Sequence, residues 1–131
     1  MFNKKARAVC IVAAGLVLGS GAAANAGTTL QSYRLNLPVL SGPAGTPAQT
    51  KAISGSSGSM SDGRIASGYT ANARECRNLI YDCGSVVYNV YPGNRLLPNS
   101  IPAGTAYVQA QISVNGTNFV AVSVSGYFAS N

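Results

Sequence analysis

Three carboxylates, Asp62, Glu75 and Asp82, are the only acidic side chains available for chemistry, and the chain has no histidine. A pair of carboxylates can cleave a glycosidic bond, with one as the acid and the other as the nucleophile or base. The absence of histidine excludes Ser-His-Asp triads and histidine general bases. Because the three acids are scattered and Asp62 lies in a Ser/Gly-rich stretch, we predict that the protein is not an enzyme and has no catalytic residues.

Metal, cofactor and nucleic-acid sites are not expected from the composition. Beyond residues 1–26 the chain has two cysteines, which are too few for a structural zinc site. Its glycines lie in Ser-rich turns, whereas a phosphate-binding loop needs them between a strand and a helix. Lysine and arginine are scattered, whereas a nucleic-acid interface needs them clustered. We therefore expect no metal, no cofactor and no nucleic-acid partner.

Residues 1–26 have the layout of a secretory signal peptide. Three basic residues precede an apolar run over residues 8–18, and residues 24–26 supply an A-x-A end. The run is shorter than the ~20 residues that span a bilayer. Cleavage would leave one secreted domain, residues 27–131, and lower the formal net charge from +6 to +3. We expect a bacterial protein that is extracellular, periplasmic or associated with the cell wall, without a membrane span.

Cys76 and Cys83 remain after such cleavage, and an even pair in an exported chain is typical of a disulfide. The local sequence also allows a helix, because residues 72–75 form a capping box and apolar residues follow at helical spacing. That helix would place the two Cα atoms about 10.5 Å apart, whereas a disulfide needs less than about 7 Å. We predict the disulfide, with the cysteines facing each other across a short hairpin or at the neck of a loop.

The segment closed by this disulfide is one candidate binding element. A disulfide-held loop with apolar residues at its tip is preorganised for binding, and a protease inhibitor would use such a loop in the cleft of the enzyme. In the alternative interpretation, Leu79 and Ile80 fold back onto the core. The candidate residues are Arg77, Asn78, Leu79, Ile80 and Tyr81.

A polar sheet face is the second candidate. The chain has seven tyrosines and no tryptophan. Tyrosine on a strand usually packs its ring and leaves its hydroxyl at the rim, but flat rings beside amide groups also suit a polysaccharide or another polymer. The candidate residues are Tyr107, Gln109, Gln111 and Phe119, with Phe119 beside Gln111.

The elements that would carry these residues are short strands separated by loops rich in Gly, Ser and Pro. Alternating apolar residues predict a strand within residues 28–40, with Tyr33, Leu35 and Leu37 on its buried face and its end at Pro38. Extended segments are also expected in residues 49–53, 65–73 and 86–91. Loops are expected in residues 41–47, 54–63 and 94–104.

The strongest alternation of apolar residues lies in residues 106–113 and again in residues 117–125. An Asn-Gly pair between them is typical of a two-residue turn, but that register would place polar residues opposite apolar ones. A three-residue loop with Gly116 in the left-handed region pairs Ala110 with Val120 and keeps one face apolar. We therefore predict a hairpin of these two segments with a bulge-type turn.

Together these patterns predict an all-β fold, a small antiparallel β-sandwich or barrel with long Gly/Ser/Pro loops and one disulfide. The expected function is that of a small secreted, non-catalytic binding or structural protein, with an extracellular polymer or protein as its partner. One alternative is a secreted inhibitor of an extracellular protease that acts through the Cys76–Cys83 loop. The other is a secreted toxin-like or antimicrobial protein.

Overall fold

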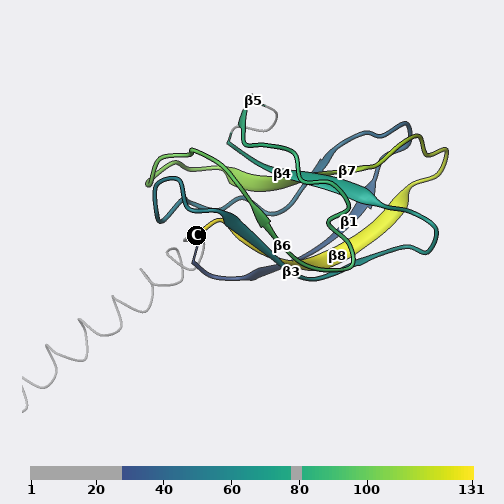
Figure 1. Ribbon diagram of the computed structural model, residues 1–131, viewed down its shortest axis with the longest axis horizontal. Helices are drawn as coiled ribbons and strands as arrows, with labels where there is room; N and C mark the ends of the chain where they lie inside the picture. The colour runs from purple at the N-terminus through teal and green to yellow at the C-terminus, as the bar shows by residue number, and fades with distance from the viewer. Residues whose placement is uncertain (1–27, 78–80) are drawn as a thin grey trace, which may run out of the picture.

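The computed structural model describes residues 28–77 and 81–131, and these residues form eight strands in two antiparallel sheets (Figure 1). The strands are β1 (Gln31–Leu37), β2 (Ala44–Gly45), β3 (Gly58–Ile65), β4 (Ala71–Arg77), β5 (Tyr81–Cys83), β6 (Gly93–Leu97), β7 (Val108–Val114) and β8 (Val122–Ala129). The expected signal peptide, residues 1–26, lies outside the described residues. Within them, no helix is long and apolar enough to cross a membrane.

The strand order is that of a jelly roll. One sheet has the order β1-β8-β3-β6 and the other the order β2-β7-β4-β5. Consecutive strands therefore alternate between the sheets, except for β4 and β5, which form a hairpin. An eight-stranded double sheet of this kind is a jelly roll, a fold that also occurs in lectins, capsid proteins and cupins. Figure 1 shows β4 and β7 in one layer and β3, β6 and β8 in the other. The predicted antiparallel sandwich is confirmed.

The hydrophobic core lies between the two sheets. Side chains alternate along each strand, so that one face of each sheet is apolar and the other is polar. In β1 the predicted buried face is confirmed, since Tyr33 and Leu37 are buried and Leu35 is half-buried. The other core residues are Met60, Ala71, Ala73, Val90, Tyr91, Leu97, Ala110, Ile112, Val114, Val122, Val124 and Phe128.

The predicted hairpin of residues 106–113 and 117–125 is wrong. β7 pairs with β2 and β4, whereas β8 pairs with β1 and β3. Ala110 therefore lies beside Glu75 of β4 rather than beside Val120. The apolar faces of β7 and β8 were identified correctly, and they face each other across the core. The predicted pairing was wrong because alternation indicates which face of a strand is buried but not which strand lies next to it. Gly116 has the expected positive φ, 89°, in the segment that crosses between the sheets.

Other segments also differ from the prediction. β3 begins within the expected loop 54–63, and β6 begins at Gly93 and continues into the expected loop 94–104. Both strands contain residues that are typical of loops, which is why the sequence pattern did not predict them. Residues 86–91 run beside β4 but form only the isolated bridge between Val87 and Ala73. Asn89 interrupts that segment with a φ of 55°. Residues 49–53 likewise contribute a bridge, between Gln49 and Val108, and no strand. The expected loop 41–47 contains the two-residue strand β2, and the expected extended segment 65–73 contains the turn from β3 to β4.

Candidate functional site

The disulfide between Cys76 and Cys83 is present and joins facing positions of β4 and β5, with the two Cα atoms 4.1 Å apart. The alternative helix is therefore wrong, and residues 71–77 are extended. In Figure 1, β5 lies at the outer edge of its sheet, away from the other layer.

The candidate binding loop is described at its two ends only. Arg77 forms an ion pair with Asp82, with 2.7 Å between Nε and Oδ2, and both side chains are partly exposed. Tyr81 pairs with Arg77 in the strand register. Asn78, Leu79 and Ile80 lie outside the described residues. The proposal that this loop binds a partner remains a prediction.

Two of the four residues expected on a polar sheet face do share one. Gln109 and Gln111 lie on the outward face of β7, since Ala110 and Ile112 point into the core. Gln111 is 7 % exposed, and its Oε1 accepts a hydrogen bond from Nη2 of Arg74 at 3.5 Å. The side chain of Gln109 lies against Gly45 of β2, where a Cβ atom would collide with it. Each glutamine is therefore close to a residue of a neighbouring strand.

Tyr107 and Phe119 do not belong to that strand face. Tyr107 precedes β7 and has a φ of 57°, so the alternation of the strand does not extend to it. Phe119 lies in the segment that crosses to β8 and is 82 % exposed. The pairing that would have placed Phe119 beside Gln111 is absent, because β7 and β8 belong to different sheets.

A hollow of about 350 Å³ lies over the Gln111 side of this sheet. Its lining includes Asn72, Arg74 and Tyr88, and Tyr88 is 64 % exposed. Oδ1 of Asn72 is buried and has no hydrogen-bond partner among the described residues. Of the residues predicted for the polar face, Gln111 lines this hollow. The ring of Tyr88 and Oδ1 of Asn72 lie beside it.

A larger groove, about 760 Å³ in volume, lies against the other sheet. Its lining includes two arginines, Arg34 of β1 and Arg64 of β3, and Tyr127 of β8. Ser125 of β8 pairs with both arginines, so the three residues form one row across three strands. Adjacent strands lie about 4.8 Å apart, which places the two arginine backbones about 10 Å from each other.

An irregularity in β3 shapes the groove. The register of β3 shifts between Met60 and Gly63 against β6, and between Ser61 and Arg64 against β8, as in a β-bulge. Asp62, inside the irregularity, has a φ of 51°. The backbone N–H of Asp62 donates to Oδ1 of Asn94, at 2.9 Å. Bulges commonly re-aim a side chain at the edge of a site. Here the bulge sets the position from which Arg64 enters the row.

Two tyrosines lie beneath the groove. The hydroxyl groups of Tyr33 and Tyr91 are 2.6 Å apart and hydrogen-bonded, and the residues are 5 % and 4 % exposed. Gly126 and Gly63 make room for them, since a Cβ atom at Gly126 would lie 2.9 Å from the Tyr33 hydroxyl and one at Gly63 would lie 2.6 Å from the Tyr91 ring. Burial raises the pKa of both tyrosines above the ordinary value of 10.0, so their hydroxyl groups stay uncharged well above neutral pH.

The two arginines of the groove are available to a ligand. Within residues 28–77 and 81–131, the ion pairs join Lys51 to Glu75 and Arg77 to Asp82. There, the guanidinium groups of Arg34 and Arg64 form no ion pair and no hydrogen bond, and both residues are exposed. Asp62, at the bulge, is the acidic residue of the lining. The groove therefore carries a positive charge at neutral pH.

Sequence reasoning did not identify this groove. The alternation that buries Tyr33 and Leu35 already implies that Arg34 faces outward, and this signal was available. No local signal indicates that Arg64 shares a row with Arg34, because their strands become neighbours only through β8.

Fold and site together define a class: a jelly-roll sandwich with a disulfide-closed hairpin on one sheet and a cationic groove on the other. No protein-family model, curated protein or solved structure matches the chain. Among the described residues, no group of three or more His, Cys, Asp or Glu side chains could hold a metal ion.

Proposed function

We propose that this protein is a small secreted, non-catalytic binding protein of the cell surface or extracellular space, and that its ligand is an acidic polysaccharide. The observation that carries the proposal is the pair of exposed guanidinium groups, Arg34 and Arg64, on either side of Ser125 in one groove.

The chemistry of the groove supports an acidic polymer. A guanidinium group presents a planar fork of donors that matches carboxylate, sulfate and phosphate groups. Two such groups about 10 Å apart suit a chain with repeated acidic groups better than a single small anion. The ring of Tyr127 and the hydroxyl of Ser125 add a flat surface and a hydrogen-bonding group for the sugar.

Binding of insoluble and soluble polysaccharides to the exported protein tests the proposal. The wild type should bind uronate or sulfated glycans and release them as salt rises, because the contacts are exposed and screened over about 10 Å at 0.1 M salt. Arg34→Gln and Arg64→Gln should each weaken binding about tenfold, which corresponds to about 1.4 kcal/mol.

Arg74→Gln is the matched control. It removes the same charge from the outward face of the opposite sheet, where Arg74 contacts Gln111. If Arg74→Gln weakened binding as much as the groove variants, net charge or the other face would account for binding. Equal binding of a neutral glucan and an acidic glycan would also contradict the proposal.

A protease inhibitor that acts through the Cys76–Cys83 loop is the second candidate. The feature that favours it is the disulfide at the neck of the β4–β5 hairpin, which limits the conformations of the loop. An inhibition assay with extracellular serine proteases should show inhibition by the oxidised protein, and reduction of the disulfide should abolish it. No inhibition by the oxidised protein would remove this candidate.

A further inference from the structure

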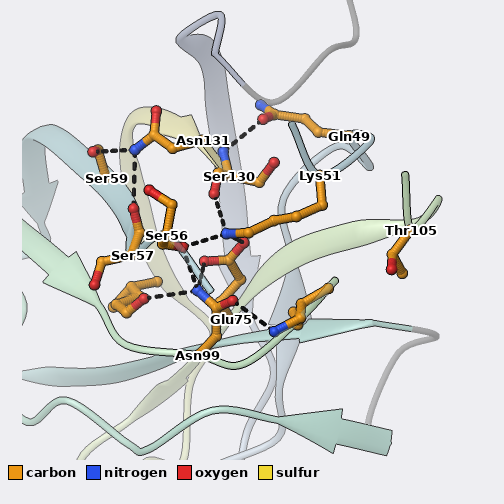
Figure 2. Close-up of polar contacts among 12 residues, drawn as sticks. Gln49, Lys51, Ser56, Ser57, Ser59, Glu75, Asn99, Thr105, Ser130 and Asn131 are labelled. Carbon is orange, nitrogen blue, oxygen red and sulfur yellow. Dashed lines mark hydrogen bonds and ion pairs between the residues drawn. The ribbon is translucent and has the colours of Figure 1, made fainter. Parts of the chain in front are cut away.

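Lys51 lies in a buried polar cluster between the two sheets and is 1 % exposed (Figure 2). Its backbone is held by residues 104–105, since its N–H donates to the carbonyl of Thr105 at 2.9 Å. Its Nζ donates to Oε1 of Glu75 at 3.1 Å and to the carbonyl oxygens of Ser56 and Ser130. The amine is therefore held in one place, out of contact with water.

Asn99 lies on the other side of the same carboxylate. Its Nδ2 donates to Oε2 of Glu75 and to the carbonyl of Ser56, both at 2.8 Å. Its Oδ1 accepts a hydrogen bond from the backbone N–H of Ile101 at 3.0 Å. The amine of Lys51 and the amide of Asn99 thus share Ser56 and the two oxygens of Glu75, as Figure 2 shows.

A buried amine, a carboxamide and a carboxyl group are the components of a transamidation. We propose that Lys51 and Asn99 become joined by an amide bond between Nζ and Cγ, with Glu75 carrying the protons and ammonia leaving.

The atoms and charges of this step balance. Nζ of Lys51 passes a proton to Oε1 of Glu75 and attacks Cγ of Asn99. The Nζ–Cγ bond forms, the Cγ–Nδ2 bond breaks, and Nδ2 leaves as ammonia. Nζ loses two protons in total, of which one goes to the leaving nitrogen and one stays on Glu75. The buried ammonium–carboxylate pair becomes a neutral amide and a neutral acid.

Several features of the cluster favour this reaction. Fixed neighbours react as if at very high concentration. The N–H of Ile101 polarises the carbonyl of Asn99 and would stabilise the oxyanion formed by the attack. Burial raises the pKa of Glu75 to about 7, although Lys51 opposes the shift, so its carboxyl group can accept and release protons at neutral pH. Loss of the charged pair also removes the cost of keeping two ions away from water.

Peptide mapping of the purified exported protein tests the proposal. After denaturation and reduction, trypsin should cleave after Arg34, Arg64 and Arg95 but not after an acylated Lys51. The expected product is peptide 35–64 joined to peptide 96–131, lighter than their sum by one ammonia. Separate peptides 35–51, 52–64 and 96–131 would overturn the proposal. The intact mass alone does not suffice, because cyclisation of an asparagine also releases ammonia.

Two variants test the assigned roles. Asn99→Ala removes the acceptor and leaves the Lys51–Glu75 pair, so cleavage after residue 51 should return. Glu75→Gln keeps the shape of the side chain but cannot carry a proton, and it should also give separate peptides. A joined product in Glu75→Gln would overturn the role of Glu75, and one in Asn99→Ala would overturn the assigned bond. The mapping of the wild type decides the proposal even where a variant fails to fold.

Discussion

The buried hydroxyl pair of Tyr33 and Tyr91 should show strong energetic coupling. Each hydroxyl has the other as its hydrogen-bond partner among the described residues, and both residues are about 95 % buried. Tyr33→Phe leaves the hydroxyl of Tyr91 buried and unsatisfied, and Tyr91→Phe does the same to Tyr33. An unsatisfied buried hydroxyl costs about 1–3 kcal/mol. We expect each single variant to lower the free energy of unfolding by that amount.

The double variant should be more stable than either single variant. With both hydroxyls removed, no polar group remains unsatisfied, and two phenylalanine rings fill nearly the same volume as the tyrosines. Replacing both partners of a hydrogen bond by apolar groups of the same shape is close to neutral. The coupling energy from the double-mutant cycle should therefore be at least about 1 kcal/mol.

Urea and thermal unfolding, followed by circular dichroism at neutral pH, measure these differences. In a domain of this size, 1 kcal/mol shifts the midpoint temperature by about 4–8 °C. The slope of unfolding free energy against urea should stay constant across the four proteins, because the exposed surface does not change. A double variant whose loss equals the sum of the two single losses would refute the reasoning, since the hydroxyls would then be independent.

Three further predictions concern the cluster and the disulfide. The pKa of Glu75 is about 7 in the folded protein and about 4.5 in the unfolded chain, so between pH 4.5 and pH 7 the folded state binds more protons than the unfolded state. The free energy of unfolding should therefore fall as the pH rises from 4.5 to 7. Urea unfolding across that range should show this trend in the wild type and not in Glu75→Gln. Replacing Cys76 and Cys83 by serine should cost about 2–3 kcal/mol in unfolding free energy, and thiol labelling of the native wild type should find neither cysteine reactive. Gly58→Ala should destabilise by about 1–3 kcal/mol, measured as a lower midpoint temperature, because its Cβ would collide with Glu75 Oε2 and lie 2.9 Å from the Phe128 ring.

The sequence predicted the buried faces of strands better than their neighbours. In β1, β7 and β8 the alternation of apolar residues identified the inward side chains, because each of these strands has an apolar face on the core and a more polar face directed outward. Pairing is decided by the whole sandwich, so Val122 lies beside Leu37, far away in the chain, and not beside the preceding strand. The disulfide was predictable because the spacing of two cysteines is a local geometric constraint.

The buried cluster was not predictable from local patterns. Lys51 is flanked by polar and small residues, and nothing near it in the sequence indicates burial. It is buried because Glu75, Ser56 and Ser130, which come from three separate parts of the chain, supply its partners. The groove depends in the same way on strands that β8 alone brings together.

The central position of β8 has a consequence for the order in which the protein folds. β8 separates β1 from β3, and Gln31 at the beginning of β1 pairs with Phe128 near the end of β8. The sheet that carries the groove therefore cannot close until residues 122–129 have left the ribosome. The other sheet, β2-β7-β4-β5, contains no part of β8, so its pairings, of which the β4–β5 hairpin is the most local, do not have to wait for β8. Sandwiches with such distant pairings fold in milliseconds to seconds, and the sheet that carries the groove gains its central pairings only after β8 is available.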